Sequence, residues 1–235
     1  MSKSILLGWL LSMAAPLLYA QPADDEFFYG FKAGVTYGSF SEVGTTIIPA
    51  VFAEETYEVV TDRQLGFMGG LQFYHRFRNS RFAIQPEIIF ADMGSQFFYK
   101  DDLDLEYQMN FRFQYVSLGT QVKVHPMGPL HFATGIQVAF NVAPNEIDYS
   151  SNMPELGPDL QIQQSLREVL RGSNDINLLL GIGADFEFGL QVELRYRLGL
   201  RDVLETQANG FNFIENENRS SGFSAMLGWL IPFPG

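Results

Sequence analysis

Strict alternation of apolar and polar residues constrains this chain more than any other feature. The clearest example runs from Leu190 to Arg201, where leucine, valine and tyrosine interleave with glutamine, glutamate, arginine and glycine. Successive side chains of a β-strand point to opposite faces, so this segment has one apolar face and one charged face. A soluble sheet also alternates, but it does not explain charges that continue through the middle of the strand, as they do in the lumen of a membrane barrel.

Seven other segments alternate in the same way, which gives eight candidate strands in all. These segments are residues 29–37, 65–77, 82–90, 116–124, 132–140, 176–186 and 223–233. A tilted strand needs roughly 9–11 residues to cross a bilayer, and most of the segments supply that length. Alternation also hides the apolar face from an averaged hydropathy, which explains why the mean hydropathy is only +0.00.

Short and long connections alternate between these segments. The short ones are 78–81, 125–129 and 187–189, and the long ones are 41–64, 92–110, 143–175 and 202–221. Short turns on the periplasmic side and long loops outside are the pattern of outer-membrane barrels. The sequence therefore predicts an all-β fold, an eight-stranded antiparallel up-and-down transmembrane β-barrel of the outer-membrane type, with both termini in the periplasm.

Residues 1–20 have the features of a secretory signal peptide. Lys3 supplies the positive charge, residues 5–18 supply the apolar segment, and Ala20 precedes the expected cleavage point at Gln21. We expect residues 21–235 to form one barrel domain in the outer membrane of a Gram-negative bacterium. The chain has no cysteine, so it has neither a lipid-anchoring thiol nor a disulfide framework.

The net charge of −12 is concentrated in the long connections, which hold most of the 27 acidic residues. The clear basic residues there are Arg63, Lys100, Arg167, Arg171 and Arg219. Such a surface repels nucleic acid, so we expect no nucleic-acid partner. It either stays solvated or attracts a cationic partner. Its densest acidic run, Asp101 to Glu106, lacks the spacing and the glycine of a calcium hand, so no calcium site is predicted.

Charged residues of both signs fall on the inward face of the predicted wall. They are Lys32, Arg76, Arg78, Glu87, Lys123, Asp185, Glu187, Glu193, Arg195, Arg197 and Arg201. The interior of an eight-stranded barrel is only wide enough to be filled by side chains. Since buried charges must pair to offset their desolvation, we predict a structural ion-pair network in the lumen. Its members are Lys32, Arg76, Glu87, Lys123, Asp185, Glu193, Arg195 and Arg197. The alternatives are a narrow gated pore and catalysis by the carboxylates.

The three histidines, His75, His125 and His131, all lie at or beside short turns. An enzyme acting on lipid of the outer leaflet would need its base near the other end of the barrel, within hydrogen-bond reach of a serine. We therefore predict that the protein is not an enzyme and has no catalytic residue, no cofactor and no bound metal. His75 faces outward beside Phe73 and Phe77, where an interfacial role is expected.

The third long connection contains a predicted helix. Asp159 would cap it and Gly172 would end it. Its apolar face would consist of Ile162, Leu166, Val169 and Leu170. Such a helix packs on the rim, covers the mouth of the barrel or meets a partner.

Two aromatic residues break the alternation of the fourth segment. Phe111 and Phe113 face inward if Val116 faces outward. Two explanations stay open, a β-bulge that resets the alternation or a set of aromatic side chains that lines the mouth.

Three segments carry a family resemblance. They are GFKAGVTYGSF at residues 30–40, FAIQPEIIFADMG at residues 82–94 and INLLLGIGADFEFGLQVELRYRLGLRDV at residues 176–203. Together they resemble three strands of the PorT-like outer-membrane barrel family of Bacteroidetes. These are the opening strand, a strand that contains the motif QPE, and a closing strand that contains the motif RY followed by GL. The resemblance implies a barrel of the cell envelope and, through one namesake, a link to type IX secretion. These motifs build barrel walls and imply no catalytic chemistry.

The last strand resembles the C-terminal signal that the barrel-assembly machinery recognises, through Gly228, Ile231 and Phe233. We therefore expect this machinery as a partner during biogenesis and outer-membrane lipid as the surroundings. The predicted function is that of an outer-membrane protein of structural or interaction type, which recognises protein partners through long acidic extracellular loops. Two alternatives stay open, an accessory component of a type IX-like secretion system and an enzyme that modifies outer-membrane lipid.

Overall fold

The computed structural model describes residues 26–41, 57–101, 105–152, 158–206 and 218–233. The predicted signal peptide, residues 1–20, lies outside these ranges. Each of the eight segments predicted as strands overlaps one long strand of the wall. These strands are β1 (Glu26–Phe40), β2 (Tyr57–Arg76), β3 (Phe82–Asp101), β4 (Glu106–Val124), β5 (Leu130–Asn141), β8 (Asp175–Asp185), β9 (Leu190–Asp202) and β11 (Arg219–Pro232).

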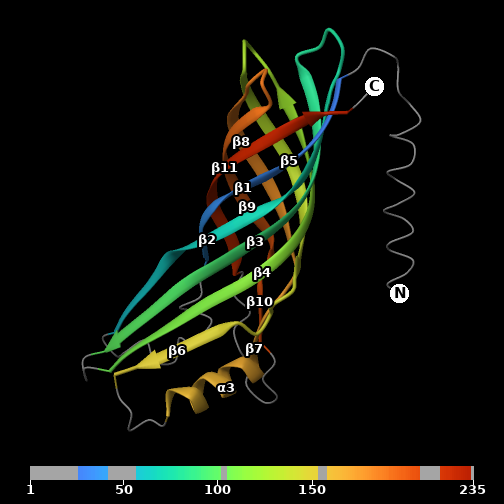
Figure 1. Ribbon diagram of the computed structural model, residues 1–235. Coiled ribbons are helices and arrows are strands. Elements are labelled where there is room, and N and C mark those ends of the chain that lie inside the picture. The colour runs from blue at the N-terminus through green and yellow to red at the C-terminus, as the bar shows by residue number, and fades with distance from the viewer. Residues whose placement is uncertain (1–25, 42–56, 102–104, 153–157, 207–217, 234–235) are drawn as a thin grey trace, which may run out of the picture.

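These strands close into a ring in which all neighbours are antiparallel (Figure 1). Their order is β1, β2, β3, β4, β5, β8, β9 and β11, and β11 pairs with β1 from Phe28↔Pro232 to Phe40↔Ser220. Lipid cannot satisfy backbone polar groups, so a wall inside a bilayer must close in this way. The predicted eight-stranded antiparallel barrel is confirmed. Within the described ranges, no helix is both long and apolar enough to cross a membrane.

The wall has an apolar outside, and its inside carries charged and polar side chains beside a small apolar cluster of Met68, Ile89, Ala91 and Met226. On β9, Leu194 is 58% exposed on the outside, whereas Glu193 and Arg195 beside it are each 3% exposed on the inside. Outward side chains of other strands, such as Phe67 and Phe132, are likewise apolar and exposed. An exterior of this kind is stable in contact with lipid rather than water.

Three tight connections join strands at one end of the barrel, which we call the short-turn end. They span residues 77–81, 125–129 and 186–189, within one residue of the predicted short connections. Each contains one residue with a positive φ, namely Asn79 at 52°, Gly128 at 52° and Gly189 at 99°. Asparagine and glycine tolerate this left-handed conformation, which allows the chain to reverse in a few residues.

The opposite end, the long-loop end, corrects two predicted loops. Residues 57–64, expected in the loop 41–64, belong to β2, which pairs with β3 there from Tyr57↔Asp101 to Arg63↔Ser95. The sequence predicts a loop at residues 92–110, but β3 and β4 continue there as a hairpin, paired without a register shift from Phe82↔Val124 to Lys100↔Glu106. β3 has 20 residues, which corresponds to about 66 Å of strand. The hydrocarbon core of a bilayer is about 30 Å thick. The hairpin is therefore longer than the lipid is thick, and Figure 1 shows β3 and β4 running side by side to the lower left.

The loop predicted at residues 92–110 was wrong because the polarity of the two faces inverts along the hairpin. Near the short turns, the inward residues of β4 are polar, as Lys123 is. Toward the other end, the inward residues Phe111 and Phe113 are apolar and fully buried, and Arg112 between them is exposed. The unbroken register excludes the β-bulge between Phe113 and Val116. Of the two explanations for the broken pattern, inward aromatic side chains are the correct one.

Further elements pack on this hairpin. Strand β6 (Ile147–Ser151) pairs with β4 from Tyr107↔Ser151 to Phe111↔Ile147. Helix α3 (Asp159–Val169) lies against β6, where Arg167 Nε donates to the Ile147 carbonyl at 2.9 Å. Strands β7 (Leu170–Gly172) and β10 (Leu204–Thr206) form a small two-stranded sheet. We use the term platform for residues 95–101 of β3 and 106–112 of β4, together with β6 and α3.

Helix α3 confirms the predicted helix but differs from the prediction at both ends. Pro158 occupies the N-cap position and no side chain caps the helix, so Asp159 is its first residue and not its cap. The helix ends at Val169 because Leu170 is extended, with φ −113° and ψ 133°, and begins β7. Gly172, the predicted end, is the last residue of that strand.

Candidate functional site in the barrel interior

Four charged side chains from β1, β3 and β9 meet inside the barrel, and we call them the central cluster. Lys32 Nζ lies 3.0 Å from Glu87 Oε2 and 3.4 Å from Glu193 Oε2. Arg195 donates from Nη1 to Glu87 Oε1 at 2.6 Å and from Nη2 to Glu87 Oε2 at 3.0 Å. Its Nε donates to Glu193 Oε1 at 3.0 Å. Because two acids and two bases neutralise one another, these side chains can be buried together at 3% exposure each.

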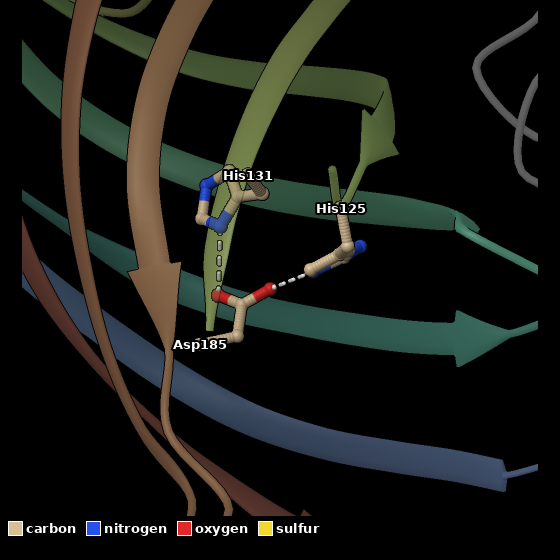
Figure 2. Close-up of side chains that lie close together, drawn as sticks. All are labelled: His125, His131 and Asp185. Atoms are coloured by element: carbon tan, nitrogen blue, oxygen red, sulfur yellow. Dashed lines mark hydrogen bonds and ion pairs between the residues drawn. The ribbon is translucent and has the colours of Figure 1, made fainter. Parts of the chain in front are cut away.

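A second group of polar side chains surrounds Asp185, closer to the short turns (Figure 2). Lys123 Nζ lies 3.2 Å from Asp185 Oδ1, and His131 Nδ1 lies 3.3 Å from the same oxygen. His125 Nε2 lies 3.0 Å from Asp185 Oδ2. The Gln191 amide donates to Oδ1 at 2.9 Å. We call His125, His131 and Asp185 the His–Asp cluster.

Neutral amides connect the strands around these charges. Gln72 donates to Gln191 Oε1 at 2.6 Å, and Gln191 donates to Gln85 Oε1 at 3.5 Å. All three glutamine side chains are buried, at 3% exposure or less. Hydrogen bonds of this kind offset the cost of removing polar groups from water.

Two more buried charges lie toward the long-loop end. Asp175 accepts hydrogen bonds from Ser220 Oγ at 2.6 Å and from the Ile176 backbone amide at 2.7 Å. Arg197 is only 5% exposed, and its Nε has no hydrogen-bond partner among the residues that the structure describes. Asp175 and Arg197 mark the boundary of the polar part of the lumen on the side of the long-loop end.

Beyond them the lumen is filled by apolar side chains, which we call the apolar layer. The Phe40 ring packs against Phe113 at a centroid distance of 5.7 Å and against Phe111 at 6.4 Å. None of its members is more than 5% exposed. The other members are Met93, Phe97, Met109, Tyr115, Ala139, Ile147, Leu170, Val203 and Leu204.

The residues predicted for the ion-pair network are distributed over these groups. The central cluster contains Lys32, Glu87, Glu193 and Arg195. Lys123 and Asp185 lie beside the histidines. Arg197 is buried closer to the long-loop end. Arg76 is exposed and is not part of a network in the lumen. Arg78, Glu187 and Arg201, also expected inside, are exposed as well. These four residues lie at strand ends or in turns, where little or no lumen remains for a side chain to face.

Sequence reasoning did not foresee that His125 and His131 converge on Asp185. His125 follows the last residue of β4 and continues the inward parity of Lys123. Extending the alternation by one residue into the turn would have placed it inside. The same parity places His131, the second residue of β5, on the inward face with 0% exposure.

Two other predicted features lie elsewhere. His75 stacks on Phe27 with a centroid distance of 4.2 Å and meets Phe77 at 4.6 Å, away from the other histidines. In the acidic run, Glu106 Oε1 pairs with Lys100 Nζ at 2.5 Å, and residues 102–104 lie outside the described ranges.

The arrangement suits a filled lumen. A channel filled with water would leave the side chains along its path accessible to solvent. In the central cluster and the apolar layer no side chain that the structure describes exceeds 5% exposure. In the central cluster, charge is therefore held by pairing and not by hydration.

Comparison with known sequences places this barrel in a family. The sequence model of the outer membrane protein beta-barrel domain matches residues 19–205. The chain belongs to this family. As a member of the outer membrane protein beta-barrel domain family, the protein is located in the outer membrane. No significant match was found among curated proteins.

Solved structures of outer-membrane proteins are similar to the chain in fold. Neisserial surface protein A is 11% identical, with 86% of this chain and 96% of that chain covered and a TM-score of 0.41. Ail, the attachment invasion locus protein of Yersinia pestis, is 9% identical, with 88% and 99% covered and a TM-score of 0.39. OprG from Pseudomonas aeruginosa is 11% identical, with 90% and 96% covered and a TM-score of 0.35. Likeness at this level carries no argument about function.

Proposed function

We propose that the protein is an outer-membrane barrel of the interaction type, closed to ions, which recognises a protein partner through its platform and its long acidic loops. The observation that carries the proposal is the platform itself. β3 and β4 carry β6 and α3 beyond the end of the wall (Figure 1). A chain that only anchored itself in lipid would need no folded structure there, and folded surface loops on a rigid scaffold are where binding sites concentrate.

The buried interior supports the absence of conduction. We expect the purified protein in planar bilayers to show no steady ionic conductance, because its inward side chains are paired or packed and not hydrated. A narrow gated pore would instead give reproducible current steps whose ion selectivity changes in Glu193→Ala. Such steps in the unmutated protein would end this part of the proposal.

We further propose that the short-turn end and both termini face the periplasm, with the platform outside the cell, because short turns face the periplasm in this class of barrel. The chain has no cysteine, so single introduced cysteines report position cleanly. Leu160 on α3 is 72% exposed and Met127 in a short turn is 71% exposed, which makes them a matched pair. In intact cells, a membrane-impermeant thiol reagent should label Leu160→Cys and spare Met127→Cys. The reverse pattern would invert the topology.

The same two positions test the interaction. A photo-reactive amino acid in place of Leu160 should capture a partner on living cells, and the same group in place of Met127 should not capture it. If the acidic loops attract a cationic partner, capture should fall as salt is raised, since salt screens charges at exposed surfaces. Equal capture from both positions, or none from Leu160 and neighbouring exposed positions of α3, would contradict the proposal.

A second candidate function is an accessory role in a type IX-like secretion system. It rests on the three PorT-like segments, and with them we propose a place among the PorT-like proteins of Bacteroidetes. A deletion strain whose secreted cargo remains in the periplasm would favour this role over recognition of an outside partner. Normal secretion would remove it.

We also propose that the protein is not an enzyme acting on lipid. His125 and His131 lie inside the barrel at the short-turn end, and His75 lies beside the turn that follows β2. All three histidines therefore lie at the opposite end of the barrel from the long-loop end, which would meet the outer leaflet. Lipid mass spectra of a deletion strain and its parent should be the same, and a missing acyl group or a missing headgroup would contradict this.

A further inference from the structure

We propose that the His–Asp cluster binds a transition-metal ion of the zinc type at the short-turn end of the lumen. Each of His125, His131 and Asp185 offers one ligand atom, and these atoms all lie within 4.8 Å of one another. Figure 2 shows both imidazole rings directed at the same carboxylate from two sides. One ion between them can contact all three residues after a small adjustment, since metal–nitrogen and metal–oxygen bonds of zinc are about 2.0–2.2 Å long.

The donor set selects the class of metal. Two imidazole nitrogens and one carboxylate oxygen suit Zn²⁺, Co²⁺, Ni²⁺ and Cu²⁺, whereas Ca²⁺ and Mg²⁺ prefer sites made of oxygen. Three protein ligands also leave one position for water, as in open zinc sites. The Asp185 side chain is 11% exposed, so the site is not completely closed to solvent.

The state of His131 is an independent indication of a ligand. Its ring is 0% exposed, and neither ring nitrogen makes a hydrogen bond within the described part of the chain, although Nδ1 lies 3.3 Å from Asp185 Oδ1. A buried polar atom without a hydrogen-bond partner is destabilising. Coordination through Nδ1 would give that nitrogen a partner. The ring also depends on Gly183, because a Cβ there would lie 2.7 Å from His131 Cε1.

Lys123 limits the affinity of this site. Its ammonium lies 3.2 Å from Asp185 Oδ1 and would be repelled by a metal ion on the same carboxylate. Two neutral groups also contact the cluster: the Tyr74 hydroxyl lies 3.4 Å from His125 Nε2, and the Gln191 amide donates to Asp185. The negative charge of Glu193 acts on His131 and on Lys123 from further inside the barrel. Without metal, Lys123 holds the carboxylate. With metal, it must move away.

The test uses the untagged full-length protein in detergent micelles, because the chain has only three histidines and a histidine tag would mask them. Zn²⁺ affinity is measured by competition with a chromophoric chelator, and Co²⁺ is followed by its visible absorption. The parent should bind one ion and show a Co²⁺ spectrum of low coordination number. His125→Gln and His131→Gln should each lose more than the roughly 10- to 100-fold that removal of an outer partner of a metal ligand costs. His75→Gln, the matched control outside the cluster, should bind like the parent.

Lys123→Met separates a metal site from a simple ion-pair group. Removing the competing cation should raise Zn²⁺ affinity by at least about tenfold, and Zn²⁺ should stabilise this variant against urea more than it stabilises the parent. Heat-resistant migration on gels shows which variants are folded, and Lys123→Met gives a gain of affinity that misfolding cannot mimic. Unchanged or weaker binding in Lys123→Met would overturn the site. So would a parent that binds no Zn²⁺, binding that survives in both glutamine variants, or stability that changes with pH but not with metal.

Discussion

The wall and the platform are built from the same two strands with opposite polarity. In the wall, the inward side chains of β4 are polar, as Lys123 is, and the outward Val122 is apolar and 43% exposed. In the platform, the inward Phe111 is fully buried and the outward Arg112 is exposed. The pairing of β3 with β4 runs unbroken through both regions. The backbone is therefore the same, and what differs is the medium around it.

The reversal of polarity along β4 indicates where the lipid ends. A strand surrounded by lipid carries its apolar side chains outward and its charges inward, whereas a strand surrounded by water does the opposite. On β4 the outward face changes between Val116 and Gln114, and the inward face changes between Ser117 and Tyr115. Two consequences follow. Charge pairing contributes inside the wall, in the central cluster, whereas the inside of the platform is held together by apolar packing.

The largest effect should come from breaking the central cluster. Glu87→Ala removes the carboxylate that Lys32 and Arg195 share, so it leaves buried positive charge without enough partners. We expect a loss of about 3–5 kcal/mol in the free energy of unfolding, measured by urea titration with heat-resistant gel migration as the readout. Glu87→Gln keeps hydrogen-bonding atoms in place and should lose less. A cost below about 1 kcal/mol, typical of solvated surface pairs, would mean that water fills this part of the lumen.

The next effect tests the boundary between the two regions. Leu194→Arg places a charge on the lipid-facing side of the wall and should cost about 2–4 kcal/mol near the midplane of the bilayer. Gln114→Arg makes the same change on an outward position beyond Val116, where Gln114 is exposed. The free energy of unfolding should change little in this variant. Equal costs in urea titrations at the two positions would show that the polarity inversion on β4 does not mark the end of the lipid.

A smaller effect should come from thinning the apolar layer. Phe113→Leu removes part of a ring that is fully buried against Phe40. We expect a loss of about 1–2 kcal/mol, because the neighbours fill the space only in part. Phe132→Leu is the control on the outer wall, where lipid chains adapt to the smaller side chain. If Phe132→Leu lowered the free energy of unfolding as much as Phe113→Leu, the apolar layer would not be packed more tightly than the lipid-facing surface.

The smallest effect should come from the ion pair between Lys100 and Glu106 at the tip of the hairpin. The two side chains are 44% and 38% exposed, so water and salt screen their attraction. Lys100→Gln should change the free energy of unfolding by no more than about 1 kcal/mol, and the change should shrink further as salt is added. A loss as large as that of Glu87→Ala would mean that exposure does not govern the strength of ion pairs in this protein.

The wall could be predicted from the sequence because one rule holds along all of it. Each membrane segment has an apolar side and a polar side, so Leu190 to Arg201 alone reveals its two faces. The extension of β3 and β4 could not be found by that rule, because beyond Val116 the polarity is reversed and the alternation looks broken. The broken pattern at Phe111 and Phe113 was itself the indication that the strand leaves the lipid.

The site was predicted where strand parity decides and missed where distance along the chain hides a contact. Parity placed Lys32, Glu87, Glu193 and Arg195 inside, and their pairing follows from the width of the barrel. Strand parity wrongly predicted that Arg76 lies inside, because parity does not show that β2 ends at this residue. The meeting of His125, His131 and Asp185 depends on two hairpin ends coming together around the ring, which no local pattern records. The start of α3 was missed because Pro158, and not a polar side chain, occupies the N-cap position, and its end was missed because Leu170 already belongs to β7.

The continuous hairpin also has a mechanical consequence. β3 pairs with β2 and β4 pairs with β5 along the wall, by hydrogen bonds that run perpendicular to the strands. A force that pulls the platform along the strand direction loads these bonds sideways together and does not peel them apart one after another. Tension applied at the tip is therefore distributed over many hydrogen bonds of the wall, and no single bond carries the whole load.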